Sequence, residues 1–423
     1  METGEKKNIP IRRFPEFLND GEWEVKRLGD LFTRVTDKNS ENNKNVLTIS
    51  AQYGLVNQFE YFSKNVAATD VTNYYIIKKG DFAYNKSRSQ GYPFGAIKLL
   101  LLYEKGVVST LYICFRLKED SLCDADFFRF CFETGMINGQ ISNIAQEGAR
   151  NHGLLNISTE DFFNIFLCVP SLAEQKRIAE CLSAVDKMIA ESNRKLELLK
   201  AHKKGLMQKL FPARGKKVPK MRFKEFEKDG EWEEKELGMA AKVKSGYAFK
   251  SNTYTQTGKY RIVTISNVKN GYLDLTNNNF IEHLPEDIQL HQILQKGDIL
   301  ISMTGNVGRV CKVYCDDCLL NQRVGLIDVY SSDVDKDYIY TILTSDRFEK
   351  SMIESGQGAA QANIGNKDIE GYRFFCPPTL PEQRKIADSF TSIDEMINQY
   401  TNKVALLEQY KKGLMQQLFP ASK

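Results

Sequence analysis

Apolar residues recur at alternating steps of three and four positions along two long segments of the chain, residues 171–211 and 378–420. This heptad spacing is typical of a helix that buries one narrow seam against a partner helix. The first seam consists of Ile178, Leu182, Val185, Ile189, Leu196, Leu199, Leu206 and Leu210. The second seam consists of Ile386, Phe390, Ile393, Ile397, Val404, Leu407, Leu414 and Leu418. Each segment is predicted to be a helix of about 40 residues, roughly 60 Å long.

Residues at the ends of both segments support this prediction. Glu174 and Glu382 stand in the first turns, where an acidic side chain complements the helix dipole, and lysines gather in the last turns. Pro212 and Pro420 then end the two helices.

The obvious partner for each seam is the other seam. Lys203 and Lys411 occupy matching polar positions in the two patterns, so the seams agree position for position. The alternative is two separate amphipathic helices, each lying on its own domain.

The sequence before each helix predicts a mostly β domain with an α+β fold. Short runs such as "YYIIKKGDFAYN" and "QKGDILISMTG" read as strands, with Gly and Asn turns between them. The predicted order is a first globular domain (12–170), a first helix (171–211), a basic linker (212–220), a second globular domain (221–377) and a second helix (378–420).

The second half of the chain repeats the first. "RFPEFLNDGEWE" at Arg13–Glu24 returns as "RFKEFEKDGEWE" at Arg222–Glu233, and "KGLMQKLFP" returns as "KGLMQQLFP". The helix start "SLAEQKRIAE" at Ser171 pairs with "TLPEQRKIAD" at Thr379 without a gap. A repeat unit of about 200 residues is too long for a solenoid repeat, so the pattern indicates a duplicated domain.

The two copies differ most within residues 33–155 and 239–362, where little beyond short anchors such as Lys-Gly-Asp is shared. This is the pattern expected of two modules with one fold and different specificities. If the helices pair, the second must run back antiparallel to the first. The chain would then have pseudo-twofold symmetry, with two unlike domains held apart by a rod.

Composition is that of an ordinary soluble protein, with 42% hydrophobic and 26% charged residues. The chain has no apolar run of about 18 residues, and its first residues lack the apolar stretch of a signal peptide. A cytoplasmic protein with no membrane contact is therefore expected. Its nine cysteines are scattered, which argues against a disulfide framework.

The spacing of the cysteines also disfavours a zinc site. Cys311, Cys315 and Cys318 form the one cluster of cysteines, but no second pair lies near them in the sequence. A structural zinc ion would need a fourth ligand from far away. No metal site is predicted.

Charge and geometry together favour duplex DNA as the partner. Basic residues dominate residues 194–224, where Glu197 is the one acidic residue, although a solvated helix face and linker would look the same. A rod that separates two domains acts as a ruler, and DNA repeats about every 34–36 Å.

Candidate DNA-contacting residues lie in the loops after the Lys-Gly-Asp anchors and nearby. Arginine suits guanine and Asn or Gln suits adenine, whereas Lys and Ser more often contact phosphates. The candidates are Lys86, Ser87, Arg88 and Gln90 in the first copy, and Lys242, Lys244, Thr304, Asn306, Arg309, Gln322 and Arg323 in the second.

Catalytic motifs are missing from the sequence. There is no Asn-Pro-Pro-Tyr or Asp-Pro-Pro-Tyr tetrad for amino-methyl transfer and no phosphate-binding Gly-x-x-x-x-Gly-Lys loop. The four histidines share no motif. No catalytic residue and no cofactor are predicted for this chain.

These repeated motifs resemble the DNA specificity subunit of type I restriction-modification systems. The resemblance spans nearly the whole chain and rests on the "DGEWE" repeats, the "KKGD" and "QKGD" anchors, the "AEQKRIA" and "PEQRKIA" helix starts and the "KGLMQ(K/Q)LFP" endings. It implies two target recognition domains, each reading half of an asymmetric, interrupted DNA site, with paired helices setting the gap.

The resemblance also implies partners that carry the chemistry. Two methyltransferase subunits would bring S-adenosylmethionine, and restriction subunits that translocate DNA would use ATP and magnesium. The duplication would then have a reason. Two identical partners need equivalent docking sites, whereas two different half-sites of the DNA need different domains. Residues that read bases vary between members, so none can be carried over.

Two other classes of function are weighed against this one. An enzyme in its own right would bind S-adenosylmethionine as an isolated chain. A coiled-coil adaptor that binds only protein would fail to bind any duplex, even with partners present.

Overall fold

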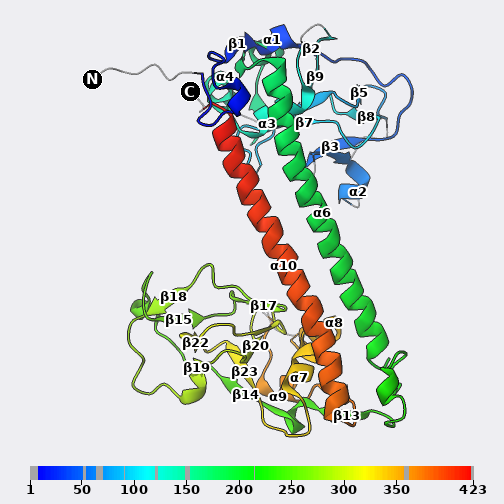
Figure 1. Cartoon of the computed structure of the whole chain (residues 1–423), viewed down its shortest axis with the longest axis vertical. Helices are drawn as coiled ribbons and strands as arrows, with labels where there is room; N and C mark the ends of the chain where they lie inside the picture. The colour runs from blue at the N-terminus through cyan, green and yellow to red at the C-terminus, as the bar shows by residue number, and fades with distance from the viewer. Residues whose placement is uncertain are drawn as a thin grey trace. The chain divides into compact units, whose positions relative to one another are not determined.

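The computed structural model describes residues 8–50, 54–62, 70–89, 91–119, 122–147, 153–213, 215–356 and 362–420. The chain folds into two compact units. Unit 1 consists of Met1–Ser192 and Lys403–Lys423, and unit 2 consists of Asn193–Asn402. The helices α6 (Leu172–Leu210) and α10 (Leu380–Leu418) therefore each begin in one unit and end in the other (Figure 1).

Unit 1 is built from short strands and helices that precede α6. In chain order they are η1 (Pro15–Phe17), β1 (Glu24–Arg27), α1 (Leu28–Leu31), β2 (Phe32–Arg34), β3 (Leu47–Ser50), β4 (Gly54–Asn57), α2 (Gln58–Phe62), β5 (Tyr75–Lys78), β6 (Phe82–Asn85), β7 (Ala96–Leu99), β8 (Lys105–Val108), β9 (Ile113–Leu117), α3 (Ala125–Glu133), α4 (Asn138–Ile144), β10 (Gln146–Glu147), β11 (Leu155–Asn156), α5 (Thr159–Phe163) and β12 (Phe166–Val169).

A four-stranded antiparallel sheet with the strand order β2-β9-β6-β7 lies at the centre of unit 1. Because successive side chains of a strand point to opposite faces, β6 contributes to two cores. Phe82 and Tyr84 are buried in the larger core and Ala83 in the smaller one. Smaller sheets pair β1 with β12, β3 with β4, β5 with β8 and β10 with β11.

Unit 2 contains the corresponding elements of the second copy. They are η3 (Lys224–Phe226), β13 (Glu233–Glu236), η4 (Leu237–Met239), β14 (Ala241–Ser245), η5 (Ser251–Thr253), β15 (Tyr260–Val263), β16 (Val268–Lys269), β17 (Tyr272–Leu273), β18 (Asn279–Ile281), η6 (Leu290–Gln292), β19 (Ile293–Leu294), β20 (Ile299–Ser302), β21 (Val310–Lys312), β22 (Cys318–Leu320), β23 (Val324–Val329), α7 (Lys336–Leu343), α8 (Asp346–Ser355), α9 (Asn366–Glu370) and β24 (Arg373–Cys376).

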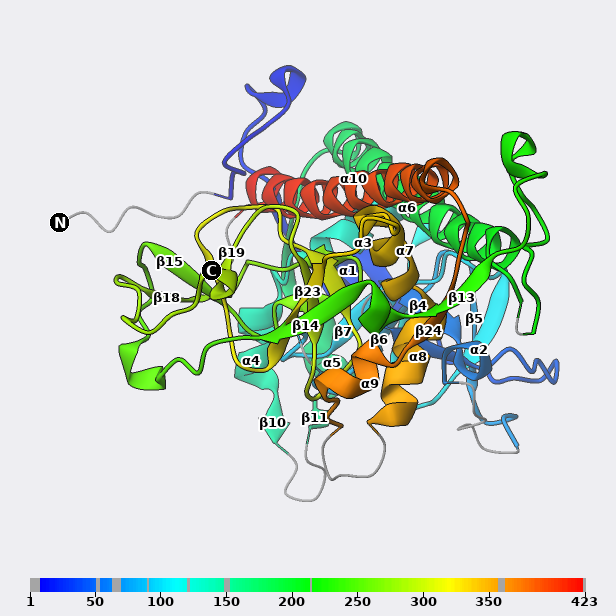
Figure 2. The same ribbon diagram turned by 90° about the horizontal axis from the view of Figure 1, so that it is seen from below.

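The central sheet of unit 2 has the strand order β14-β23-β20-β21, which matches the central sheet of unit 1 strand for strand. The pair β13-β24 likewise matches β1-β12. Figure 2 shows α9 beside β14 in this unit. The peripheral sheets differ, because unit 2 has a second four-stranded sheet, β18-β15-β22-β19, that unit 1 lacks among its described residues. The structure thus confirms two copies of one mixed α and β fold with different peripheries.

The Lys-Gly-Asp anchors shape the turn before the central strand in each copy. Gly80 and Gly297 have φ angles of 91° and 92°, a left-handed conformation that glycine adopts without a steric penalty. Asp81 accepts a hydrogen bond of 2.8 Å from the backbone of Lys78, and Asp298 accepts the equivalent bond of 2.8 Å from Gln295. The anchor is therefore a structural turn that fixes where the following loop begins.

The repeated N-terminal motif holds a buried ion pair with the start of each long helix. In unit 1, Arg13 donates two hydrogen bonds of 2.7 and 2.6 Å to Glu174. In unit 2, Arg222 donates two bonds of 2.7 Å to Glu382. The carboxylate side chains are 1% and 0% exposed, so both charges depend on their arginine partner. Hydrogen bonding to the carboxylate raises the pKa of each guanidinium group.

The glutamine after each of these glutamates ties the helix start to the rest of its unit. Gln175 donates to the backbone of Pro170 at 2.9 Å and accepts from the backbone of Asp124 at 3.0 Å. Gln383 makes the equivalent bonds with Pro377 at 3.1 Å and Asp335 at 2.8 Å. The shared Glu-Gln pair therefore joins three separate segments at the first turn of each helix.

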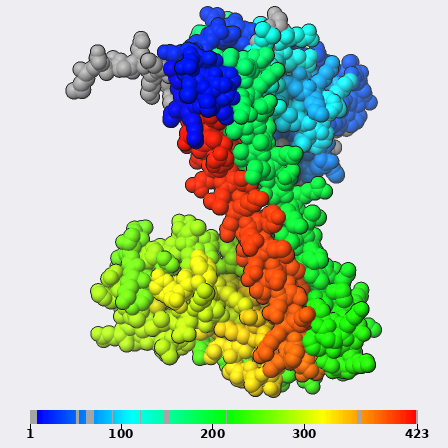
Figure 3. Space-filling model, viewed as in Figure 1, coloured from blue at the N-terminus to red at the C-terminus, as the bar shows by residue number. Residues whose placement is uncertain are grey.

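In unit 1, seam residues of both long helices share one core with the globular part. Ile178, Leu182 and Val185 of α6 are buried there together with Leu414 and Leu418 of α10. The N-terminal segment also contacts α10, as the space-filling view shows (Figure 3), through a backbone hydrogen bond of 2.9 Å from Arg12 to Gln417.

In unit 2, Leu210 of α6 lies in the main core with Ile386 and Phe390 of α10, and Leu206 packs against it. Of the other seam residues, Leu196, Leu199 and Ile393 are buried, whereas Ile189, Ile397, Val404 and Leu407 are half-buried. The ends of the seams therefore pack into globular cores, a role that the heptad pattern did not indicate. No helix among the described residues is both long and apolar enough to cross a membrane.

Removing one partner of the buried ion pair should destabilise unit 2 strongly. We expect Glu382→Ala to cost about 3–5 kcal/mol, because it leaves the charge of Arg222 buried and unpaired. Urea unfolding followed by Trp232 fluorescence, with Trp23 replaced by Phe, measures this. The exposed pair of Lys385 and Glu225, 3.6 Å apart, provides the control: Lys385→Ala should cost no more than about 1 kcal/mol. Equal losses would contradict a special role for the buried pair.

Candidate nucleic-acid interface

In unit 1, the loop after β6 carries three of the predicted DNA-contacting residues. Ser87 and Arg88 are exposed, and Lys86 is half-buried, which lowers the pKa of its ammonium group. The loop is held in place because Lys86 accepts a backbone bond of 3.0 Å from Leu155 and Arg88 donates one of 2.7 Å to Gly153. The fourth candidate, Gln90, lies outside the described residues.

In unit 2, the loop after β20 is supported in a similar way. Ile364 donates a backbone bond of 3.0 Å to Met303, and the hydroxyl of Thr304 donates to the side chain of Asn363 at 3.1 Å. Asn306 is exposed in the same loop. Each copy therefore pins the loop after its central strand against a segment that lies far along the chain.

The structure brings a second predicted group to this loop. Gln322 and Arg323 are exposed in the turn between β22 and β23. The backbone of Met303 donates to Arg323 at 3.2 Å, and Gln322 donates to the backbone of Tyr247 at 2.9 Å. Residues 303–306 and 321–323 thus form one edge of the unit, which we call the unit 2 polar edge.

The remaining predicted cations are matched by acidic side chains. Lys242 lies 3.3 Å from Glu370 and Lys244 lies 2.6 Å from Asp328. Arg309 is 4.0 Å from Glu349. These pairs neutralise much of the positive charge that made Lys242 and Lys244 candidates, so they are weaker candidates than Gln322 and Arg323.

Two residues of this region were missed in the sequence analysis. Asn363 is exposed beside Thr304, and the shared Asn-Ile dipeptide of the two copies was the available signal. Tyr247 supports Gln322 through its backbone and donates its hydroxyl to Asp287 at 2.7 Å. No sequence pattern linked it to this edge, because the contact arises from strand pairing.

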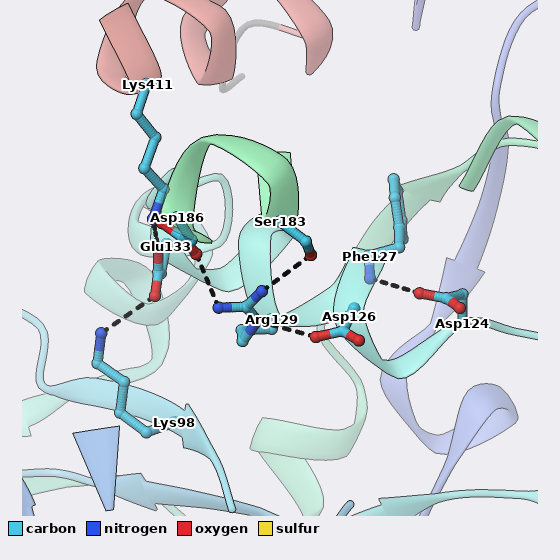
Figure 4. A network of polar contacts seen from close by, with 9 residues as sticks. All are labelled: Lys98, Asp124, Asp126, Phe127, Arg129, Glu133, Ser183, Asp186 and Lys411. Carbon is cyan, nitrogen blue, oxygen red and sulfur yellow. Dashed lines mark hydrogen bonds and ion pairs between the residues drawn. The ribbon is translucent and has the colours of Figure 1, made fainter. Parts of the chain in front are cut away.

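The end of α10 is joined to unit 1 by a network of charged groups (Figure 4). Lys411 lies 2.8 Å from Asp186 of α6 and 3.1 Å from Glu133 of α3. Arg129 also contacts Asp186, at 2.9 Å, and Lys98 contacts Glu133 at 3.4 Å. Burial pushes the pKa of Glu133 up, but Lys98 and Lys411 outweigh it, so this pKa lies below its ordinary value.

Unit 2 contains the matching contact of the other helix ends. Lys203 of α6 lies 2.7 Å from Asp394 of α10. In the repeat, Lys203 corresponds to Lys411 and Asp394 corresponds to Asp186. The polar members of the two seams therefore make equivalent ion pairs, one within each unit.

Comparison with known proteins shows which family has these two copies of one domain. The family model described as "Type I restriction modification DNA specificity domain" matches the chain twice, over residues 20–201 and 229–409. The chain belongs to this family. The two matches cover both copies of the repeat, which confirms the resemblance of the shared motifs.

Relatives of the family match along much of the chain. The type I restriction enzyme MjaVIII specificity subunit of Methanocaldococcus jannaschii is 25% identical over 414 residues, covering 93% of this chain and 91% of the relative. The EcoAI specificity subunit of Escherichia coli is 27% identical over 310 residues, covering 67% of this chain and 49% of the relative. Both are named as specificity subunits of restriction enzymes.

A solved structure supports the fold of the family. The crystal structure of the type I restriction-modification S subunit from M. genitalium aligns with a TM-score of 0.63 and 16% identity, covering 98% of this chain and 100% of that chain. At this identity the match concerns the fold, which is shared over nearly the whole length.

Replacing Lys411 should weaken unit 1 and shift its response to acid. We expect Lys411→Met to cost about 1–3 kcal/mol at neutral pH, because Asp186 and Glu133 lose a charged partner. A carboxylate with a lowered pKa stabilises the folded state above its unfolded pKa, and this stability is lost as the pH falls through the folded pKa. Raising the pKa of Glu133 should therefore make acid unfolding begin at a higher pH.

The measurement is acid unfolding followed by Trp23 fluorescence with Trp232 replaced by Phe. Lys412→Met is the matched control, because Lys412 is the exposed neighbour on the same turn. If both variants unfold at the same pH as the parent chain, the network does not stabilise unit 1 in the way described.

Proposed function

We propose that this chain is the DNA-reading and scaffolding subunit of a type I restriction-modification complex and carries no catalytic site of its own. Its two globular domains would each read one half of an asymmetric, interrupted duplex site. The two long helices would set the gap and dock two methyltransferase subunits as well as restriction subunits. Such a complex would work in the cytoplasm.

The observation that carries this proposal is one scaffold built twice with different loops. The central sheets β2-β9-β6-β7 and β14-β23-β20-β21 share a strand order, and in both a Lys-Gly-Asp turn precedes the strand that leads into the loop. The loops themselves differ, with "KSRS" after β6 and "MTGN" after β20. A constant frame with variable loops suits two domains that read different sequences with one mode of docking.

The exposed side chains of the unit 2 polar edge suit base recognition. Arg323 can donate two hydrogen bonds to guanine, and Asn306 or Gln322 can pair with adenine. The backbones of Gln322 and Arg323 are fixed by hydrogen bonds to neighbouring segments, and the carbonyl of Asn306 accepts a hydrogen bond from the hydroxyl of Ser302, so little loop ordering would be needed on binding. In unit 1, Arg88 and Ser87 hold the equivalent place.

We also propose that α6 and α10 pair as an antiparallel coiled coil. Two contacts support this arrangement. An early residue of α6, Asp186, meets a late residue of α10, Lys411, while the late Lys203 of α6 meets the earlier Asp394 of α10. Contacts in this crossed order are those of helices running in opposite directions, and polar seam residues are known to fix register.

Exposed apolar residues at matching positions support docking of two like partners. Met188 and Met396 are 46% and 38% exposed, and Leu198 and Leu406 are 57% and 66% exposed. Each pair occupies corresponding positions in the repeat. Equivalent surfaces of this kind fit two copies of one methyltransferase subunit. S-adenosylmethionine, ATP and magnesium would belong to the partner subunits, which would supply the chemistry.

The decisive experiment is to express this chain with its methyltransferase partner and map methylated bases genome-wide. We expect one two-part motif with a fixed gap. Replacing residues 33–155 with the matching stretch of another family member should change one half of the motif and leave the other half and the gap unchanged. If the complex forms and binds S-adenosylmethionine but no base is methylated, the proposal that these domains read DNA is contradicted.

A paired substitution tests the unit 2 polar edge. We expect Arg323→Ala to weaken specific binding by about 1–3 kcal/mol and to relax the sequence requirement at one position, because a bidentate contact with a base is lost. Lys242→Ala should have little effect, since Glu370 already neutralises this lysine. Competition binding of the assembled complex to matched and mismatched duplexes measures both variants. Equal losses would remove Arg323 from the list of base readers.

A further inference from the structure

The connection between β21 and β22 of unit 2 places two thiols in contact. Residues 313–317 connect the strands, and the Sγ atoms of Cys315 and Cys318 are 3.2 Å apart. Asp317 between them has a φ of 66°, and its carbonyl accepts a backbone hydrogen bond of 2.8 Å from Arg261 on β15. The turn is therefore fixed by the neighbouring strand as well as by its own conformation.

A third donor group joins the two thiols. One carboxylate oxygen of Asp317 and the Sγ atoms of Cys315 and Cys318 all lie within 4.8 Å of one another. Cys311, the third cysteine of the sequence cluster, lies on β21 and is not among these grouped donor atoms. The grouped donors are thus two cysteines and an aspartate, a set that the spacing of the cysteines did not indicate.

These donors match the preferences of zinc. Zinc binds thiolates at about 2.3 Å and carboxylate oxygens at about 2.0–2.2 Å, in tetrahedral geometry. Two thiolates on one tetrahedral zinc ion are about 3.8 Å apart, so the thiols need to separate by only about 0.6 Å. Sites with three protein ligands complete the tetrahedron with water.

We propose that Cys315, Asp317 and Cys318 bind one thiophilic divalent cation of the zinc class, with water as the fourth ligand. Access is available, because Cys315 is half-buried and Asp317 is exposed, while Cys318 anchors the site in the core. Arg261 lies 3.8 Å from one oxygen of Asp317. This long, solvent-screened contact leaves the second oxygen available to the metal.

Protonation follows from burial. Burial raises the pKa of the Cys318 thiol, and its hydrogen bond with Cys315 raises it further. Metal ligation requires thiolates, so binding must release any proton that a thiol carries. Metal affinity should rise with pH for this reason.

The site belongs to the variable part of unit 2. The corresponding connection in unit 1 joins β7 to β8, and its sequence, "LLLYE", contains no cysteine. In unit 2 the metal would close the turn at the start of β22, the strand that leads directly into Gln322 and Arg323. Metal binding itself does not depend on the proposed function, whereas an effect on the unit 2 polar edge does.

Cobalt(II) titration of the reduced, full-length chain tests the site directly. We expect one equivalent to bind with a thiolate-to-cobalt band in the near ultraviolet and the visible bands of a tetrahedral ion, and zinc should displace it. Cys315→Ser and Cys318→Ser should abolish the thiolate band. Asp317→Asn should lower the affinity for the metal by at least about 10–100-fold. Loss of a residue that only orients a ligand costs about that much, and Asp317 is proposed to be a ligand itself.

Asp316→Asn is the matched control, because Asp316 is the exposed neighbour in the same turn. Asparagine tolerates a positive φ, so Asp317→Asn should preserve the turn. Unchanged affinity in Asp316→Asn together with weaker binding in Asp317→Asn supports the three-ligand site. A fully reduced chain that gives no band above the Cys315→Ser level overturns the proposal, as does an Asp317→Asn variant that binds as tightly as the parent.

Discussion

Each half of the molecule depends on one buried contact, the bidentate ion pair between an arginine of the N-terminal motif and the glutamate in the first turn of a long helix. Arg13 with Glu174 and Arg222 with Glu382 make the same two hydrogen bonds in the two units. The neighbouring glutamines add bonds to a strand end and to the start of a buried helix. These bonds hold the first turn of each long helix and thereby fix the direction of the helix relative to its own domain.

This constraint explains why the chain repeats the segments that it does. The motifs shared by the copies are those that fix the helix start, the turn before the central strand and the ion pairs of the seams. The segments that differ form the peripheral sheets and the exposed loops. A frame that is held constant lets the loops change without altering where they are presented, which is what a family of DNA specificity domains requires.

The long helices and the duplication could be predicted because both are local or periodic in the sequence. The DNA-contacting residues stay predictions, and charge along the sequence does not show which acidic side chain lies opposite each cation. Lys242 on β14 is neutralised by Glu370, which lies 128 residues later in the chain. Likewise, Cys311, Cys315 and Cys318 form one cluster in the sequence, but the donor atoms that lie close together in the structure are those of Cys315, Asp317 and Cys318. Such outcomes depend on strand pairing, which spacing along the chain does not encode.

The composition of unit 1 has a consequence for how the protein is made. Its main core includes Leu414, Leu418 and Phe419, whose ring packs 6.0 Å from that of Trp23. All of unit 2, residues 193–402, leaves the ribosome before these side chains do. Unit 1, whose synthesis begins first, is therefore completed last. Until α10 has been synthesised, part of the apolar core of unit 1 stays uncovered.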